Sequence, residues 1–180
     1  QYVIDAGTTL RRAVDNLPYV VGFTQPFAEG QPRGHDYPAF HLADALLRAN
    51  LDVSGFALDF EFGGAPDQTR PRDLCQLFDR LQHWNSFGLP MVVTTSQSAA
   101  SSATATKFDS RRWGQPQFVR WLELLDASRM VHAVFWNHAV DDADTGRGLV
   151  TSSGRATING QYFRRAFRLA DARESHPQSG

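Results

Sequence analysis

The sequence predicts an α/β protein in which about four strand-helix units form one parallel sheet. Short runs rich in β-branched and aromatic residues recur along the chain, at 19–24, 54–60, 91–95 and 131–136. An amphipathic helical pattern follows each run. The runs begin roughly 35 to 40 residues apart, which is the length of one strand-plus-helix unit in a sheet built from βα units.

The helices are predicted from apolar residues that recur every three or four positions, the periodicity of a helix with one buried face. The predicted buried faces are Phe40, Ala43 and Leu47; Leu74, Leu77, Phe78, Leu81 and Trp84; Phe118, Trp121, Leu122 and Leu125; and Tyr162, Phe163, Ala166, Phe167 and Ala170. A further helix is expected over 8–17, ended by Pro18. Cys75 lies within an apolar periodic stretch and is expected to be a buried small hydrophobe.

The second strand distinguishes between two parallel-sheet architectures. Side chains alternate along a strand, so small groups and then carboxylates occupy one face: Gly55, Ala57, Asp59 and Glu61. Large apolar groups occupy the other: Phe56, Leu58, Phe60 and Phe62. A doubly wound sheet would carry apolar groups on both faces, whereas a barrel packs one face on helices and opens the other into a site. The pattern therefore favours a barrel.

Composition limits the classes of partner. The chain has 180 residues, 42% hydrophobic and 21% charged, with a formal net charge of -1, which gives no electrostatic reason to expect nucleic acid or an anionic membrane as partner. No apolar run approaches the roughly 20 residues that cross a bilayer. Phosphate-binding glycine motifs and metal-ligand spacings are absent from the sequence. We therefore expect no cofactor and no metal, and a neutral substrate.

Acids, amides and aromatics follow the predicted strands, where parallel folds build their sites. They are Gln25, Glu29, Asp59, Glu61, Thr95, Trp136 and Asn137. Carboxylates can act on a glycosidic bond, amides bind hydroxyls, and indole faces stack on sugar rings, so the set suits carbohydrate. Asp59 and Glu61 also suit a solvated strand edge or an ion pair, and Trp136 suits the core as well as a sugar platform.

A family resemblance runs through the strand segments. Residues 23–30 read FTQPFAEG, 53–59 read VSGFALD, 88–94 read GLPMVVT, and 134–136 read VFW, with GLV at 148–150. In this order they resemble the last four βα units of glycoside hydrolase family 10, the xylanase family. The resemblance implies that 1–180 is the C-terminal half of a (β/α)₈ TIM barrel, whose remaining N-terminal half would precede Gln1.

The sequence also departs from that family. Thr95 stands where the family has its nucleophilic glutamate, and the acid/base glutamate would lie before Gln1. A threonine cannot supply the carboxylate that a retaining double displacement needs. In a divergent branch of the family, Glu61 or Glu29 would take over a carboxylate role, and Glu61 is the best candidate catalytic carboxylate. The substrate-binding candidates are Gln25, Glu29, Asp59, Thr95, Trp136 and Asn137.

Three functional hypotheses follow. The first is a fragment of a family 10-like glycoside hydrolase that acts on a β-glycan such as xylan, inactive without the rest of its barrel. The second is a non-catalytic carbohydrate-binding barrel that has lost hydrolysis. The third is an unrelated α/β enzyme or scaffold whose strand-end acids bind something else. The family resemblance implies an extracellular or periplasmic location, and an oligo- or polysaccharide as partner.

Overall fold

Helices and strands alternate along the chain in the computed structural model, which describes residues 2–13, 18–24, 26–27, 38–62, 69, 72–97, 115–141 and 148–174. The elements, in order, are α1 (Tyr2–Ala13), β1 (Tyr19–Thr24), α2 (Ala39–Arg48), β2 (Val53–Phe62), α3 (Leu74–Asn85), β3 (Met91–Gln97), α5 (Gln115–Ala127), β4 (Val131–Trp136) and α6 (Ile158–Glu174).

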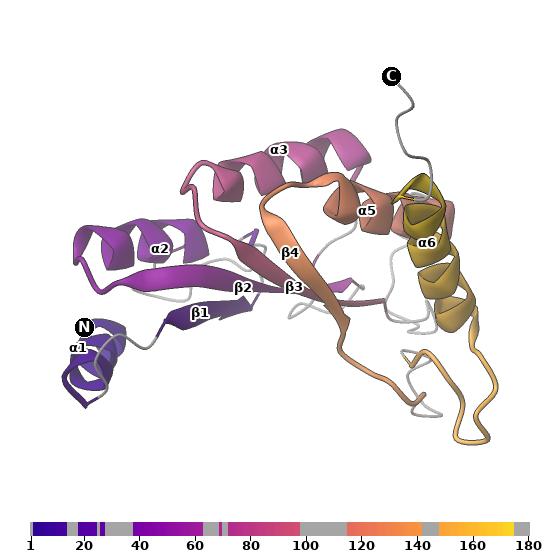
Figure 1. The fold of residues 1–180 in the computed structure, drawn as a ribbon, viewed down its shortest axis with the longest axis horizontal. Helices are drawn as coiled ribbons and strands as arrows, with labels where there is room; N and C mark the ends of the chain where they lie inside the picture. The colour runs from indigo at the N-terminus through magenta and orange to yellow at the C-terminus, as the bar shows by residue number, and fades with distance from the viewer. Residues whose placement is uncertain are drawn as a thin grey trace.

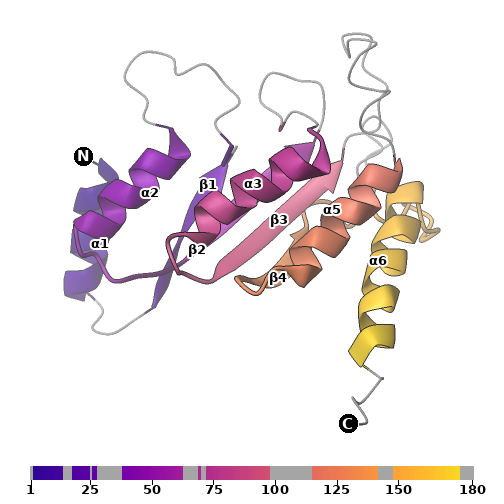
Figure 2. The same ribbon diagram turned by 90° about the horizontal axis from the view of Figure 1, so that it is seen from above.

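The strands form one sheet in the order β1-β2-β3-β4, and every neighbouring pair is parallel. Helices α2, α3 and α5 lie on one face of this sheet, α6 lies beside the β4 end, and α1 lies beyond the β1 edge (Figures 1 and 2). We call the opposite face, which none of the described helices covers, the open face. The predicted fold class, four parallel βα units in sequence order with helices on one face, is confirmed.

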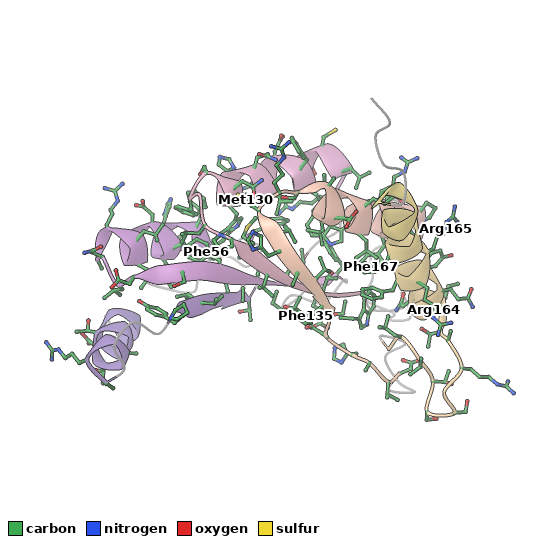
Figure 3. All side chains as sticks on the ribbon, in the orientation of Figure 1. Phe56, Met130, Phe135, Arg164, Arg165 and Phe167 are labelled. Carbon is green, nitrogen blue, oxygen red and sulfur yellow. The ribbon has the colours of Figure 1, made fainter. Side chains whose placement is uncertain are left out.

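Alternation along β2 explains why the helices gather on one face. Phe56, Leu58, Phe60 and Phe62 are each 0% exposed, whereas Ala57, Asp59 and Glu61 between them are half-buried. Large apolar side chains are most stable where helices exclude water from them. Figure 3 shows the two environments: Phe56 lies on the helix side of the sheet and Phe135 of β4 lies on the open face.

Aromatic rings dominate the core between the sheet and the helices. The ring centroid of Phe56 lies 5.5 Å from that of Trp84 in α3, and the centroid of Phe60 lies 5.2 Å from that of Trp121 in α5. Both tryptophans are almost completely buried, as predicted. Truncation of a buried aromatic side chain to alanine typically costs about 3–5 kcal/mol, so this layer holds the helices on the sheet.

Some element boundaries differ from the prediction. The first helix begins at Tyr2 rather than at residue 8, and Asp5 in its first turn favours that start because a carboxylate stabilises a helix N-terminus. Residues 14–17, also predicted as helix, lie outside the described residues. Strand β3 continues to Gln97, beyond the predicted end at Thr95.

Two side chains of α3 are more exposed than predicted. The buried residues of this helix are Leu77, Leu81 and Trp84, which form a narrow stripe at i, i+4 and i+7. Cys75 lies off this stripe and is exposed, and Phe78 at its margin is 45% exposed. The prediction of a buried Cys75 is wrong because an apolar periodic segment buries only one face.

Candidate functional site

Polar side chains gather on the open face where the parallel strands end. The register pairs Asp59 of β2 with Thr94 of β3, and Glu61 with Ser96 two residues further on. Register partners in a parallel sheet carry their side chains on the same face, so these four share the open face. Asn137, directly after β4, joins them from the next strand.

Asp59 is the centre of this group. The Thr94 hydroxyl donates a hydrogen bond to Asp59 Oδ1 at 3.0 Å, and Asn137 Nδ2 donates to the same oxygen at 2.7 Å. Within the described residues, Oδ2 of Asp59 accepts no hydrogen bond. The carboxylate is therefore oriented through one oxygen, while its second oxygen can accept a hydrogen bond from a ligand.

The backbone holds Asn137 in position for this contact. Its N–H donates to the carbonyl of Thr95 at 3.1 Å, which continues the β3-β4 pairing one residue past the end of β4. The side chain of Asn137 then spans β3 to reach Asp59 on β2. Two of the predicted substrate-binding residues, Asp59 and Asn137, are thus in direct contact.

Glu61 and Ser96 lie one step further toward the strand ends. The backbone carbonyl of Glu61 accepts a hydrogen bond from the N–H of Thr69 at 2.7 Å, so the chain returns to the end of β2 after the strand. Ser96 is 0% exposed, and its Oγ has no hydrogen-bond partner in the part of the chain that the structure describes. A buried hydroxyl without a partner carries a desolvation cost that a bound polar group would relieve.

Thr95 does not join this group, which corrects its prediction as a substrate-binding residue of the same site. It pairs with Phe60 and Trp136 and is 0% exposed on the helix side of the sheet. The cause is alternation: once Thr94 and Ser96 point to the open face, Thr95 between them points away.

Trp136 also lies on the helix side. Its ring centroid is 5.4 Å from that of Phe118 in α5 and 5.7 Å from that of Phe163 in α6. Of the two interpretations of Trp136, this position fits the core. The aromatic ring that β4 presents to the open face is Phe135, 56% exposed and in register with Thr94.

The remaining site predictions have different outcomes. Gln25 and Glu29 lie outside the described residues. Thr94 was not predicted as a site residue, because the sequence prediction chose its neighbour Thr95 instead. Which β3 side chains face the site could be inferred only from the register with β2, because residues 92–96 of β3 are valine, threonine or serine on both faces.

Among the described residues, no three His, Cys, Asp or Glu side chains lie close enough to hold a metal ion. None of the described helices combines the length and apolar character that a transmembrane helix needs.

Comparison with known proteins shows similarity of fold. No protein-family model matches the sequence, and no curated protein matches it. Among solved structures, xylanase 10B from Thermotoga maritima aligns over 94% of this chain and 52% of its own, with a TM-score of 0.64 and 10% identity. A family 10 xylanase from Thermobacillus composti aligns over 92% and 57%, with a TM-score of 0.60 and 12% identity.

A glycanase of another family is similar to the same extent. The GH128 endo-β-1,3-glucanase from Sorangium cellulosum aligns over 98% of this chain and 62% of its own, with a TM-score of 0.61 and 16% identity. This chain thus spans about half the length of the xylanases it matches. At these identities the likeness shows the fold alone: four parallel βα units that resemble half of a glycoside hydrolase barrel.

Proposed function

We propose that this chain is the C-terminal half of a glycoside-hydrolase-type barrel that hydrolyses O-glycosidic bonds in a β-glycan such as xylan. The observation that carries the proposal is the polar group on the open face, in which Asp59 is oriented by Thr94 and Asn137 beside Glu61. Active sites of (β/α)₈ enzymes lie at this end of the strands.

A carbohydrate suits the chemistry of this group. Carboxylate and amide oxygens accept hydrogen bonds from sugar hydroxyls, and the exposed ring of Phe135 adds an apolar surface on the same face. The likeness to family 10 xylanases supports a β-glycan, and one such match is a xylanase 10B from Thermotoga petrophila in complex with xylobiose.

Glu61 is our candidate for the general acid/base. Glycoside hydrolysis in most families needs two carboxyl groups, one to transfer the proton to or from the glycosidic oxygen and one to attack the sugar or to activate water. Glu61 shares the open face with Asp59. Because Oδ1 of Asp59 already accepts two hydrogen bonds, Asp59 suits substrate binding rather than proton transfer. The second catalytic carboxylate is proposed to come from the N-terminal half of the barrel, our proposed partner for the open face.

Turnover on xylo-oligosaccharide tests the assignment in the complete protein that contains this chain. We expect Glu61→Gln to lower turnover by on the order of 10² or more, since loss of a general acid/base typically costs ~10²–10⁴ in rate. Glu123→Gln on α5 is the matched control, because it removes the same charge from a helix. Parental turnover in Glu61→Gln contradicts the acid/base role.

A second candidate function is a carbohydrate-binding barrel without hydrolysis. The observation that favours it is that β3 contains no Asp or Glu and carries Thr94 and Ser96 on the open face, so this strand supplies no carboxylate to the site. Equilibrium binding followed alongside product formation separates the two candidates. A complete protein that binds xylo-oligosaccharide and releases no product over prolonged incubation supports binding alone.

A further inference from the structure

The charged side chains that the four described strands carry to the open face have one sign. None of the four strands contains Lys or Arg, and the charged side chains that they carry there are Asp59 and Glu61. Positions i and i+2 of a strand are about 6.6 Å apart, so a ligand bound at Asp59 also lies near Glu61. A neutral ligand can donate hydrogen bonds to acceptors there, whereas an anionic ligand is repelled by like charge.

The hydrogen-bond acceptors left over in the group around Asp59 also favour a neutral ligand. Thr94 and Asn137 each donate to Asp59 Oδ1, which leaves Asp59 Oδ2 and the amide oxygen of Asn137 as acceptors. A sugar hydroxyl can donate to either oxygen. A ligand carboxylate has no proton to donate at neutral pH, and its approach would desolvate Asp59 without compensation.

Ser96 gives an independent indication that a ligand with hydroxyl groups completes this site. Its side chain is fully buried on the same face, in register with Glu61, and its Oγ has no partner among the described residues. A hydroxyl both donates and accepts, so the group that pairs with it best is another hydroxyl.

We infer that the open-face site selects uncharged glycans and rejects glycans that carry uronic acid carboxylates. Asp59 is the specificity-determining residue, and Thr94 and Asn137 are the residues that position it. The inference rests on the proposed function, because it names the class of glycan that the proposed site binds.

The test compares two xylo-oligosaccharides of equal length, one unsubstituted and one bearing a glucuronic acid. Binding to the complete protein is measured by titration calorimetry, with product analysis to verify that each glycan stays intact. The unsubstituted glycan is expected to bind about tenfold more tightly at low salt, because like charges in a binding site discriminate between partners. The preference should shrink as added salt screens the carboxylates.

Variants assign the effect to residues. Asp59→Asn keeps the shape and removes the charge, so the preference should fall severalfold. Asp44→Asn is the matched control, because it removes the same charge from α2, where Asp44 pairs with Arg48. Thr94→Val should weaken binding of the unsubstituted glycan by freeing Asp59 to rotate, and Thr94→Ser, which keeps the hydroxyl, should restore it.

The outcomes separate this inference from the function on which it rests. Equal affinity for the two glycans, or an unchanged preference in Asp59→Asn, overturns the inference and leaves the proposed function standing. Absence of binding to either glycan overturns the proposed function and the inference together. Equal weakening in Thr94→Val and Thr94→Ser overturns the positioning role of the Thr94 hydroxyl.

Discussion

Two adjacent threonines of β3 have opposite environments. The hydroxyl of Thr94 donates to Asp59 on the open face, whereas the hydroxyl of Thr95 is buried against the helices without a partner among the described residues. An unpartnered buried hydroxyl destabilises the folded state, because it has lost its hydrogen bonds to water. The two residues therefore contribute in opposite ways, one to the site and the other to a local loss of stability.

At the residue scale, we predict that Thr95→Val raises the free energy of unfolding of the complete protein by about 1 kcal/mol, since valine has nearly the same shape and no hydroxyl to desolvate. Turnover on xylo-oligosaccharide should change little. Denaturant titration gives the stability. The matched variant is Thr94→Val, which should not stabilise because it breaks the bond to Asp59; a loss of stability in Thr95→Val would indicate that its hydroxyl is paired.

At the element scale, β2 is the strand on which both the core and the site depend. From residue 55 onward, its even-numbered positions bury four large apolar side chains, whereas its odd-numbered positions carry Gly55, then alanine, and then two carboxylates. A Cβ at Gly55 would lie 2.8 Å from the carbonyl oxygen of Pro90, the residue before β3. That oxygen accepts the hydrogen bond of the Phe56 N–H at 3.0 Å, so a side chain at Gly55 would push apart the start of the β2-β3 pair.

We accordingly predict that Gly55→Ala lowers the free energy of unfolding by about 1–3 kcal/mol, the usual cost of overpacking. Gly22→Ala on β1 is the control, because a Cβ at Gly22 meets nothing within 4 Å. That substitution should be neutral or stabilising by up to about 1 kcal/mol, through the lower entropy of the unfolded chain. Equal effects at the two glycines in denaturant titration would show that contact with Pro90 is not the cause.

At the scale of the whole molecule, the sheet has one covered face and one open face. Within the described residues β1 and β4 are edge strands, and the open face exposes apolar side chains, of which Phe135 is 56% and Val20 is 51% exposed. Unpaired strand edges and apolar patches favour association with other chains. Half of a barrel would have this geometry, so we expect the open face to associate with another chain or segment.

We predict that the 180-residue chain on its own is inactive on xylan and self-associates at micromolar concentration. Sedimentation velocity over a concentration series should show a rising mean sedimentation coefficient. Phe135→Lys should weaken the association, because it places a charge on the open face, whereas Phe78→Lys on the outer surface of α3 should not. A monomer with a sharp cooperative melt at all concentrations would contradict the half-barrel interpretation.

Most of the fold follows from the sequence because its causes are local. Alternation in β2 and the three- and four-residue spacing in the helices determine which side chains must be buried, and burial determines that α2, α3 and α5 share one face of the sheet. The same alternation places Asp59 and Glu61 together on the other face. Gln25 and Glu29 were predicted from their position after the first strand, and they lie outside the described residues.

The composition of the candidate site was decided by tertiary structure. The sequence of β3 has hydroxyl or small apolar side chains at successive positions, so its pattern alone does not say whether Thr94 or Thr95 faces the site. Register with β2 decides this, because it places Thr94 beside Asp59 and Thr95 beside Phe60. In the same way, register with β3 turns Trp136 toward the helices and Phe135 toward the open face. Periodicity determines the faces of a strongly patterned strand, whereas pairing with such a strand determines the faces of its weakly patterned neighbours.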